Sequence, residues 1–339
     1  MSISLTMPDL LSNKPAAVVP VFSFQICGLP VSLATSSALL LKLYADYFRY
    51  YSSPLPREAV RTTVPLKLQL TLTPLLPAQE KLIPTDAEFI AQSGQVSFWR
   101  GQKRGREQFF FHTDITFFRV EPERGHAIGF ISAAALQSPH LLANTYTFVI
   151  LLLLLRWHGR YHLHTAAVIS PRESLHLICG APRAGKSTLT TALAVSGWQA
   201  ISDDGILLQA TEQGQAAAYA FKRDFHIAAE LLRKWKGLRQ AVSRHNYFDR
   251  ACVDALDFFQ TKPLAELPFT RATRVIFPQI TGEAKSRLES LQPSEAIHRL
   301  IEQSMFFPLW SEHTQKQMTL LAAFVKEASF LRLLAGMDI

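Results

Sequence analysis

The sequence has few cysteines, no long apolar run and little charge, and each of these limits what the protein can be. Cys27, Cys179 and Cys252 lie far apart in no metal-binding spacing, and an odd number of cysteines fits a reducing cytoplasm better than a disulfide framework. The longest apolar run, from Phe148 to Leu155, is much shorter than the roughly 20 residues that a membrane span requires. It predicts part of a buried helix. No basic segment followed by an apolar one marks the N-terminus, so we expect no signal peptide and a cytoplasmic location.

The chain of 339 residues is 48% hydrophobic and 18% charged, which excludes wholesale disorder and allows two domains. Its net charge of +8 favours anionic partners in general. The basic residues are scattered, however, with modest clusters only at Lys103–Arg106 and Arg233–Lys236. We therefore expect no role centred on nucleic acid.

The N-terminal part of the chain has the pattern of a β-rich domain. Residues 1–18 are expected to be a loose end. Phe22–Ile26 and Leu29–Leu33 predict two short strands around a turn at Cys27 and Gly28, and Ala38–Tyr51 predicts a helix. From Val64 to about Ser132 apolar residues alternate with period two. This pattern predicts a small antiparallel β-rich α+β domain over residues 1–135, without chemistry that can be named.

Residues 136–339 alternate between strand and helix patterns, which is typical of an α/β domain. The expected elements are an apolar helix over Leu141–Arg156, strands over Leu163–Ile169 and Leu175–Cys179, a helix ending at Gly197, a strand over Trp198–Ser202, a hairpin from Ile206–Ala210 to Ala216–Phe221, a helix over Phe225–Arg239, a strand over Thr273–Phe277, and helices over Pro293–Gln303 and Ser311–Ala335.

A phosphate-binding loop lies between the second of these strands and the next helix. It has the pattern Gly-x-x-x-x-Gly-Lys-Ser, in which backbone N–H groups and the helix N-terminus bind phosphate, the lysine bridges the β- and γ-phosphates, and the hydroxyl holds Mg²⁺. The residues assigned to the nucleotide are Gly180, Ala181, Pro182, Arg183, Ala184, Gly185, Lys186, Ser187 and Thr188. Pro182 removes one N–H donor, and Arg183 either touches a phosphate or points to water.

Two adjacent carboxylates, Asp203 and Asp204, end the strand that follows the loop helix. At the carboxyl edge of a sheet they suit a Mg²⁺ shell and a general base. Neighbouring strand positions point in opposite directions, so we expect the two side chains to have different roles; a turn or helix cap is the alternative. His164, on the strand before the loop, is a further candidate for the active site.

In combination, His164 with Thr165–Ile169, the loop and Ile201–Asp204 resemble the catalytic core of the HPr kinase/phosphorylase family. The apolar helix before His164, together with the segments Val275–Pro278 and Leu291–Ala296, is more similar to its divergent HPr-kinase-like relatives, some of which accompany peptide-modification genes. The resemblance implies a P-loop kinase core after the β-rich domain.

The resemblance also implies ATP, Mg²⁺ and a Ser/Thr-type hydroxyl acceptor on a peptide, a protein or a small molecule. By matching positions, Lys186 holds the β- and γ-phosphates and Ser187 binds the metal. One of the aspartates is the general base, which we assign to Asp203, and Asp204 lies at the metal. His164 occupies the position of an active-site histidine in the family.

The sequence departs from the better-known members of that family. It lacks their Glu-x-Arg-Gly-Leu-Gly signature, with Lys222–Asp224 in roughly that region, and their Gly-Arg-Asn segment; Arg271 and Arg274 are the nearest basic candidates for contacting the transferred phosphate. The acceptor, the nucleotide preference and the oligomeric state, a homo-oligomer included, stay open. The alternatives to a kinase are a non-catalytic nucleotide-binding regulator or scaffold and a P-loop ATPase.

Overall fold

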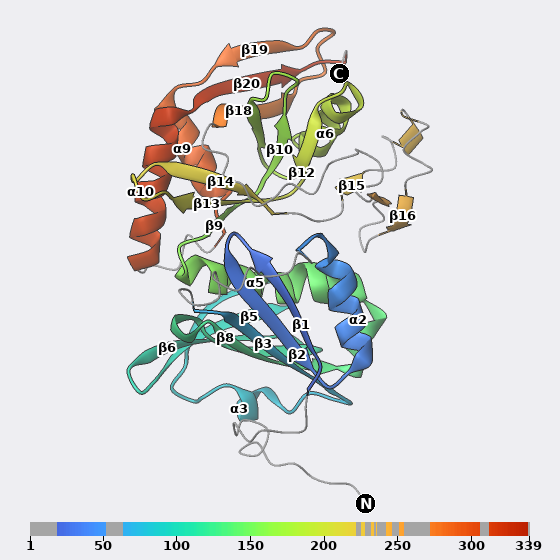
Figure 1. Ribbon diagram of the computed structural model, residues 1–339, viewed down its shortest axis with the longest axis vertical. Helices are drawn as coiled ribbons and strands as arrows, with labels where there is room; N and C mark the ends of the chain where they lie inside the picture. Colours follow the sequence, from blue (N-terminus) through green and yellow to red (C-terminus); the bar gives the residue numbers. More distant parts are fainter. Residues whose placement is uncertain are drawn as a thin grey trace, which may run out of the picture. The chain divides into compact units, whose positions relative to one another are not determined.

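A computed structural model describes residues 19–51, 64–221, 225–227, 232–233, 235, 242–245, 251–253, 272–305 and 312–337. The chain divides into two units, residues 1–25 with 29–154 and residues 26–28 with 155–339 (Figure 1). The division lies about one helix later than the boundary expected after residue 135, because most of the apolar helix before Leu155 belongs to the first unit.

The first unit contains an eight-stranded sheet in the order β1-β2-β3-β8-β7-β6-β5-β4. Its strands are β1 (Val21–Ile26), β2 (Leu29–Thr35), β3 (Leu66–Thr73), β4 (Glu88–Ser93), β5 (Val96–Lys103), β6 (Arg106–His112), β7 (Thr116–Glu121) and β8 (His126–Ser132). The expectation of an antiparallel sheet is wrong for β3, which runs parallel to both β2 and β8. A parallel neighbour needs a crossover connection, and the chain between β2 and β3 contains helix α2 (Ala38–Tyr47).

Aromatic side chains fill the core of this unit. Phe117 lies between Phe110 and Phe130, with ring centroids 6.4 and 6.2 Å apart, and all three are buried. Helix α2 adds Tyr44, whose hydroxyl group bonds Thr147 Oγ1 at 2.5 Å. The described residues of this unit also form short helical turns: η1 (Arg49–Tyr51), α3 (Gln79–Leu82), η3 (Pro122–Arg124) and η4 (Ala133–Gln137).

One continuous helix runs through residues 139–157, in the segments α4 (Pro139–Leu141), η5 (Leu142–Thr147, with π-helical turns) and α5 (Phe148–Trp157). By length and composition alone it is able to cross a membrane, but 67% of its most apolar window is buried inside the protein. The core helix of a protein shows the same degree of burial. The sequence predicts such a buried helix for Phe148–Leu155.

The second unit is built on a six-stranded sheet in the order β12-β10-β11-β18-β20-β19. Its strands are β10 (Thr165–Ile169), β11 (Leu175–Cys179), β12 (Gln199–Ser202), β18 (Ala272–Ile280), β19 (Arg287–Ser290) and β20 (Ser329–Ala335). The helices in the described part of this unit include α6 (Lys186–Val195), α9 (Pro293–Glu302) and α10 (Glu312–Glu327). Strands β11, β18 and β20 are parallel neighbours. Leu189, Leu193 and Trp198 pack against buried residues of β10 and β11.

The prediction of a single helix over Ser311–Ala335 is wrong, because its last part is β20. This strand pairs with β18 over seven residues, and Phe330, Leu333 and Leu334 are buried. The helical spacing of the apolar residues is therefore overridden by a non-local pairing that the local pattern does not encode.

Two small sheets complete the second unit: β14-β13-β9 and β15-β17-β16. Their strands are β9 (Tyr161–Leu163), β13 (Ile206–Ala210), β14 (Ala216–Ala220), β15 (Phe225–Ile227), β16 (Val242–His245) and β17 (Ala251–Val253). The predicted strand Leu163–Ile169 is thus two strands in different sheets, with His164 at the break. The predicted helix from Phe225 begins instead as β15, and Lys236 and Arg239 lie outside the described residues.

Candidate functional site

The phosphate loop follows the fully buried strand β11 and leads directly into α6. Gly185 has a φ of 99°, which disfavours a side chain, and a Cβ on Gly180 would lie 3.1 Å from the Cβ of Ala184. Arg183 also has a positive φ, 69°. The backbone conformation therefore favours glycine at position 185, and a side chain at position 180 would crowd Ala184. The first N–H groups of α6 have no partner within the helix.

Lys186 is buried at the start of α6. Its ammonium group donates to the carbonyl oxygens of Gly180 at 2.7 Å and Ala181 at 3.3 Å. The positive charge is therefore held within the loop, where phosphate oxygens would replace the carbonyl oxygens as acceptors. Ser187 and Thr188 are half-buried on the first turn of the same helix.

The aspartate pair ends a strand that is not adjacent to the loop strand. Strand β10 lies between β11 and β12 and is antiparallel to both, with Thr165 opposite Cys179 and Ala167 opposite Ser202. Strands β11 and β12 consequently run in the same direction. The loop, Asp203–Asp204 and His164 therefore lie at one edge of the sheet, which we call the ligand edge.

The two aspartates have different surroundings. Asp204 Oδ1 lies 3.0 Å from His164 Nδ1, and about one third of each side chain is exposed. Asp203 is only 3% exposed at its side chain; its Oδ2 accepts the backbone N–H of His226 at 2.7 Å and lies 3.8 Å from that residue's Nδ1. This geometry favours Asp204 as the carboxylate that reaches a ligand and Asp203 as the one that holds the strand end in place. From the sequence, by contrast, we assign the general base to Asp203.

A serine and a glycine fix the turn that carries the aspartates. Ser202 Oγ donates to the carbonyl of Phe221 and accepts the N–H of Gly205. A Cβ on Gly205 would lie 2.5 Å from His162 Nε2, so only glycine fits beside that ring. The turn therefore depends on residues of β9 and the β14 end, which the local sequence does not reveal.

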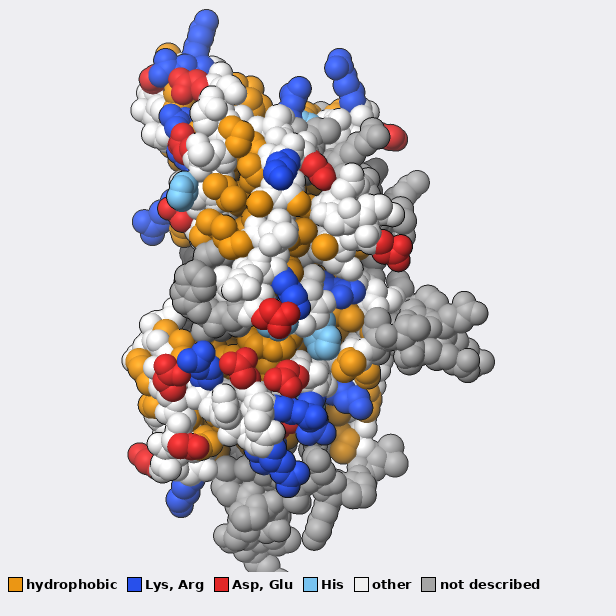
Figure 2. All heavy atoms as spheres, turned by 90° about the vertical axis from the view of Figure 1, so that its left-hand side faces the viewer, with side chains coloured by type: hydrophobic (Ala, Val, Ile, Leu, Met, Phe, Trp, Pro, Cys, Tyr) orange, Lys and Arg blue, Asp and Glu red, His pale blue; other side chains and the backbone are white. Residues whose placement is uncertain are grey.

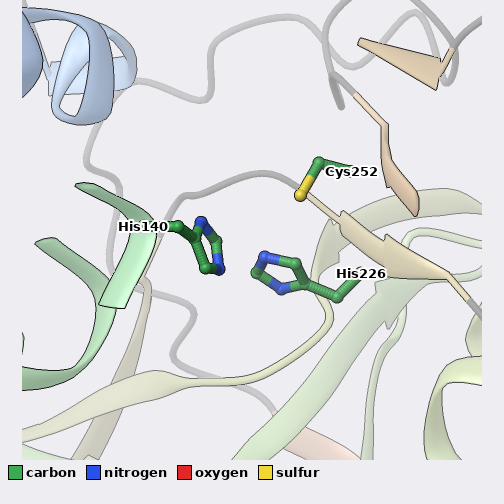
Figure 3. Close-up of side chains that lie close together, drawn as sticks. All are labelled: His140, His226 and Cys252. Atoms are coloured by element: carbon green, nitrogen blue, oxygen red, sulfur yellow. The ribbon is translucent and has the colours of Figure 1, made fainter. Parts of the chain in front are cut away.

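His226 is the site residue that sequence reasoning missed. It lies on β15, opposite Cys252 of β17 (Figure 3). Nothing in the segment around it indicates this role, because the three-residue strand has the local pattern of a helix start. The other cysteine near the site, Cys179, is buried, and burial raises the pKa of its thiol to about 12, which makes it a poor nucleophile.

A cleft of about 660 Å³ opens on the other side of the loop, toward β18. The first half of the loop, the residues Phe277–Ile280 and one face of α9 form its walls. Arg299 of α9 lies 5.4 Å from the ring centroid of Phe277 and donates to Glu295, which also accepts from Arg332 at 2.7 Å. The hydrogen bond from Arg299 lowers the pKa of Glu295. This volume is within the range of small-molecule sites.

Arg274, one of the basic candidates proposed from sequence, does not join this edge. Arg274 pairs with His176 in the middle of the ladder between β18 and β11, whereas the phosphate loop follows the end of β11. Its expected contact with phosphate is therefore not supported. Arg271 and Lys222–Asp224 lie outside the described residues.

No family model matches this chain, and no curated protein sequence matches it. The resemblance to HPr kinase therefore rests on the residues quoted for it, and the function has to be argued from the ligand edge itself.

Proposed function

We propose that the protein is an ATP-dependent kinase that transfers the γ-phosphoryl group to a hydroxyl group of a peptide, a protein or a small molecule. The observation that carries this proposal is the pairing of His164 with Asp204 at the same sheet edge as the phosphate loop. A loop alone supports phosphate binding. A loop with an ordered histidine–carboxylate pair supports proton removal from an acceptor.

The phosphates bind to the loop. Lys186 and the N-terminus of α6 supply positive charge and N–H donors to the β- and γ-phosphates. Mg²⁺ prefers oxygen ligands, and the Ser187 hydroxyl group and the Asp204 carboxylate are oxygen donors that fit it. When bound, the ion would neutralise charge on the phosphates.

The His164–Asp204 pair removes the acceptor proton. Nδ1 of His164 donates to Asp204 Oδ1, which orients the ring and leaves Nε2 as the basic atom. The acceptor O–H transfers its proton to Nε2 while the oxygen attacks the γ-phosphorus, and the bond from that phosphorus to the bridging oxygen breaks, releasing ADP. Asp203 acts indirectly, by holding the end of β12.

The nucleoside occupies the cleft beside β18. The aspartates and His164 lie on one side of β11 in the sheet, and β18 lies on the other. A nucleotide with its γ-phosphate toward Asp204 therefore extends its base and ribose toward Phe277 and α9.

The test is transfer of labelled γ-phosphate from ATP with Mg²⁺ to a panel of Ser/Thr peptides and small alcohols. We expect His164→Gln and Asp204→Asn to retain nucleotide binding and to lose transfer by a factor of about 10² to 10⁴. Lys186→Ala should lose both. Asp114→Asn and His112→Gln, in the first unit, are the matched controls and should transfer like the wild type.

Undiminished transfer by His164→Gln and Asp204→Asn would contradict the proposal. Equal release of phosphate with and without any acceptor would indicate an ATPase. Tight ATP binding without transfer or hydrolysis would indicate a nucleotide-binding regulator.

A further inference from the structure

A charged cleft of about 430 Å³ lies in the first unit, and no residue of the ligand edge lines it. It is formed around the turn between β5 and β6, the turn between β7 and β8, and the strand ends beside them. Its walls are Lys103, Arg104, Arg106, Glu107, Gln108, Arg119, Glu121, Glu123, Arg124 and His126. Figure 2 shows acidic and basic side chains interleaved on one face of this unit.

The positive charge of Arg119 is poorly balanced by nearby acceptors. Its side chain is only 12% exposed, and its one ion pair among the described residues joins Nε to Glu121 Oε1 at 3.6 Å. That separation is too long for a hydrogen bond, and Nε is buried without an acceptor. Burial lowers the pKa of Arg119, because it disfavours the charged form of the side chain.

Glu121 does not supply the missing hydrogen bond to Arg119, because its carboxylate oxygens accept from other side chains. Oε1 accepts from Gln108 Nε2 at 3.0 Å, and Oε2 accepts from Arg124 Nη1 at 3.1 Å. Burial also lowers the pKa of the neighbouring His126, which disfavours the charged form of its ring. An anion that enters the cleft and accepts a hydrogen bond from this guanidinium group stabilises a charge that Glu121 leaves poorly compensated.

The charges around Arg119 limit the kind of anion. Lys103, Arg104, Arg106 and Arg124 add positive charge, whereas Glu107, Glu121 and Glu123 add negative charge. A polyanion such as nucleic acid would meet the three glutamates. A single carboxylate on an otherwise uncharged chain meets the arginine and leaves the surrounding ion pairs intact.

We propose that this cleft binds a single carboxylate group, with Arg119 as the residue that receives it. The site is independent of the phosphate loop and does not require that the protein be a kinase.

The test follows the Nε–H signal of Arg119 by NMR in the full-length protein, assigned with Arg119→Lys. The probes are acetyl-Gly-Ser-Glu-Ser-Gly-amide, the same peptide with Gln in place of Glu, and inorganic phosphate, each titrated into the millimolar range. We expect the Glu peptide to shift the signal in a saturable way and the Gln peptide to bind at least about tenfold more weakly.

Arg119→Gln should abolish saturable binding of the Glu peptide. Arg100→Gln is the matched control, because Arg100 lies in the same sheet but is already paired with Glu88 at 2.6 Å, and it should bind like the wild type. Unfolding midpoints of both variants establish that the sheet is intact. Equal shifts with the Glu and Gln peptides, no shift with either, or a shift with phosphate alone would each overturn the proposal.

Discussion

The six-stranded sheet of the second unit carries polar side chains at its ligand edge, whereas the eight-stranded sheet of the first unit packs aromatic rings into a core. At the ligand edge, Lys186 is held by hydrogen bonds to carbonyl oxygens of the loop, and Asp204 pairs with His164. In the first unit, Phe110, Phe117 and Phe130 are fixed by packing alone. The two regions should therefore respond differently to substitution: the edge should lose chemistry and keep its fold, and the core should lose its fold and leave the chemistry unaffected.

The largest expected effect is on stability, in the aromatic core. Phe130 is 1% exposed, so Phe130→Ala should lower the free energy of unfolding of the first unit by about 3–5 kcal/mol. Hydrogen exchange measured during urea unfolding reports on the two units separately. Phe89→Ala, in the same sheet but 49% exposed, is the control and should cost much less. A loss of ATP affinity in folded Phe130→Ala protein would contradict the separation of the two regions.

The next effect is on nucleotide binding. Lys186→Met removes the ammonium group that the loop holds, and should weaken ATP binding by about a hundredfold, or roughly 2.7 kcal/mol. Calorimetric titration measures the affinity, and the unfolding midpoint should change little. Lys326→Met, at an exposed position of α10, removes the same charge elsewhere and should bind ATP normally. Equal affinities for the two variants would show that the loop is not the nucleotide site.

The same contrast explains how much could be predicted from the sequence. The loop, β11 and α6 are contiguous in the chain, so local spacing is enough to locate them, and Asp203 and Asp204 follow on the next strand. His226 and β20 depend on pairing with segments far away in sequence, and the parallel partners of β3 depend on a crossover. Local periodicity carries no information about such pairings, and this is why their segments were predicted as helix or as antiparallel sheet.

A smaller effect separates the two aspartates. Asp203→Ala leaves the buried N–H of His226 without the carboxylate that accepts it, and should lower the free energy of unfolding by about 1–3 kcal/mol. Asp204→Ala removes a pair with His164 in which about one third of each side chain is exposed, and should cost less than about 1 kcal/mol, although it should abolish transfer. Denaturant unfolding of both variants measures the difference. Equal destabilisation would mean that Asp204 also serves the fold, and the contrast between edge and core would then fail at this point.

The smallest expected effect is at Arg183, where the backbone of the ligand edge is itself strained. Its φ of 69° disfavours any residue with a Cβ, so Arg183→Gly should stabilise the second unit by up to about 1 kcal/mol, whereas Arg183→Ala keeps the conformational cost. Both variants remove the guanidinium group, which makes their ATP affinities informative. Because Arg183 is exposed, we expect both affinities to stay within about threefold of wild type. A matched loss of affinity in both would instead show that Arg183 contacts a phosphate, and the left-handed backbone would then be the conformation that directs it there.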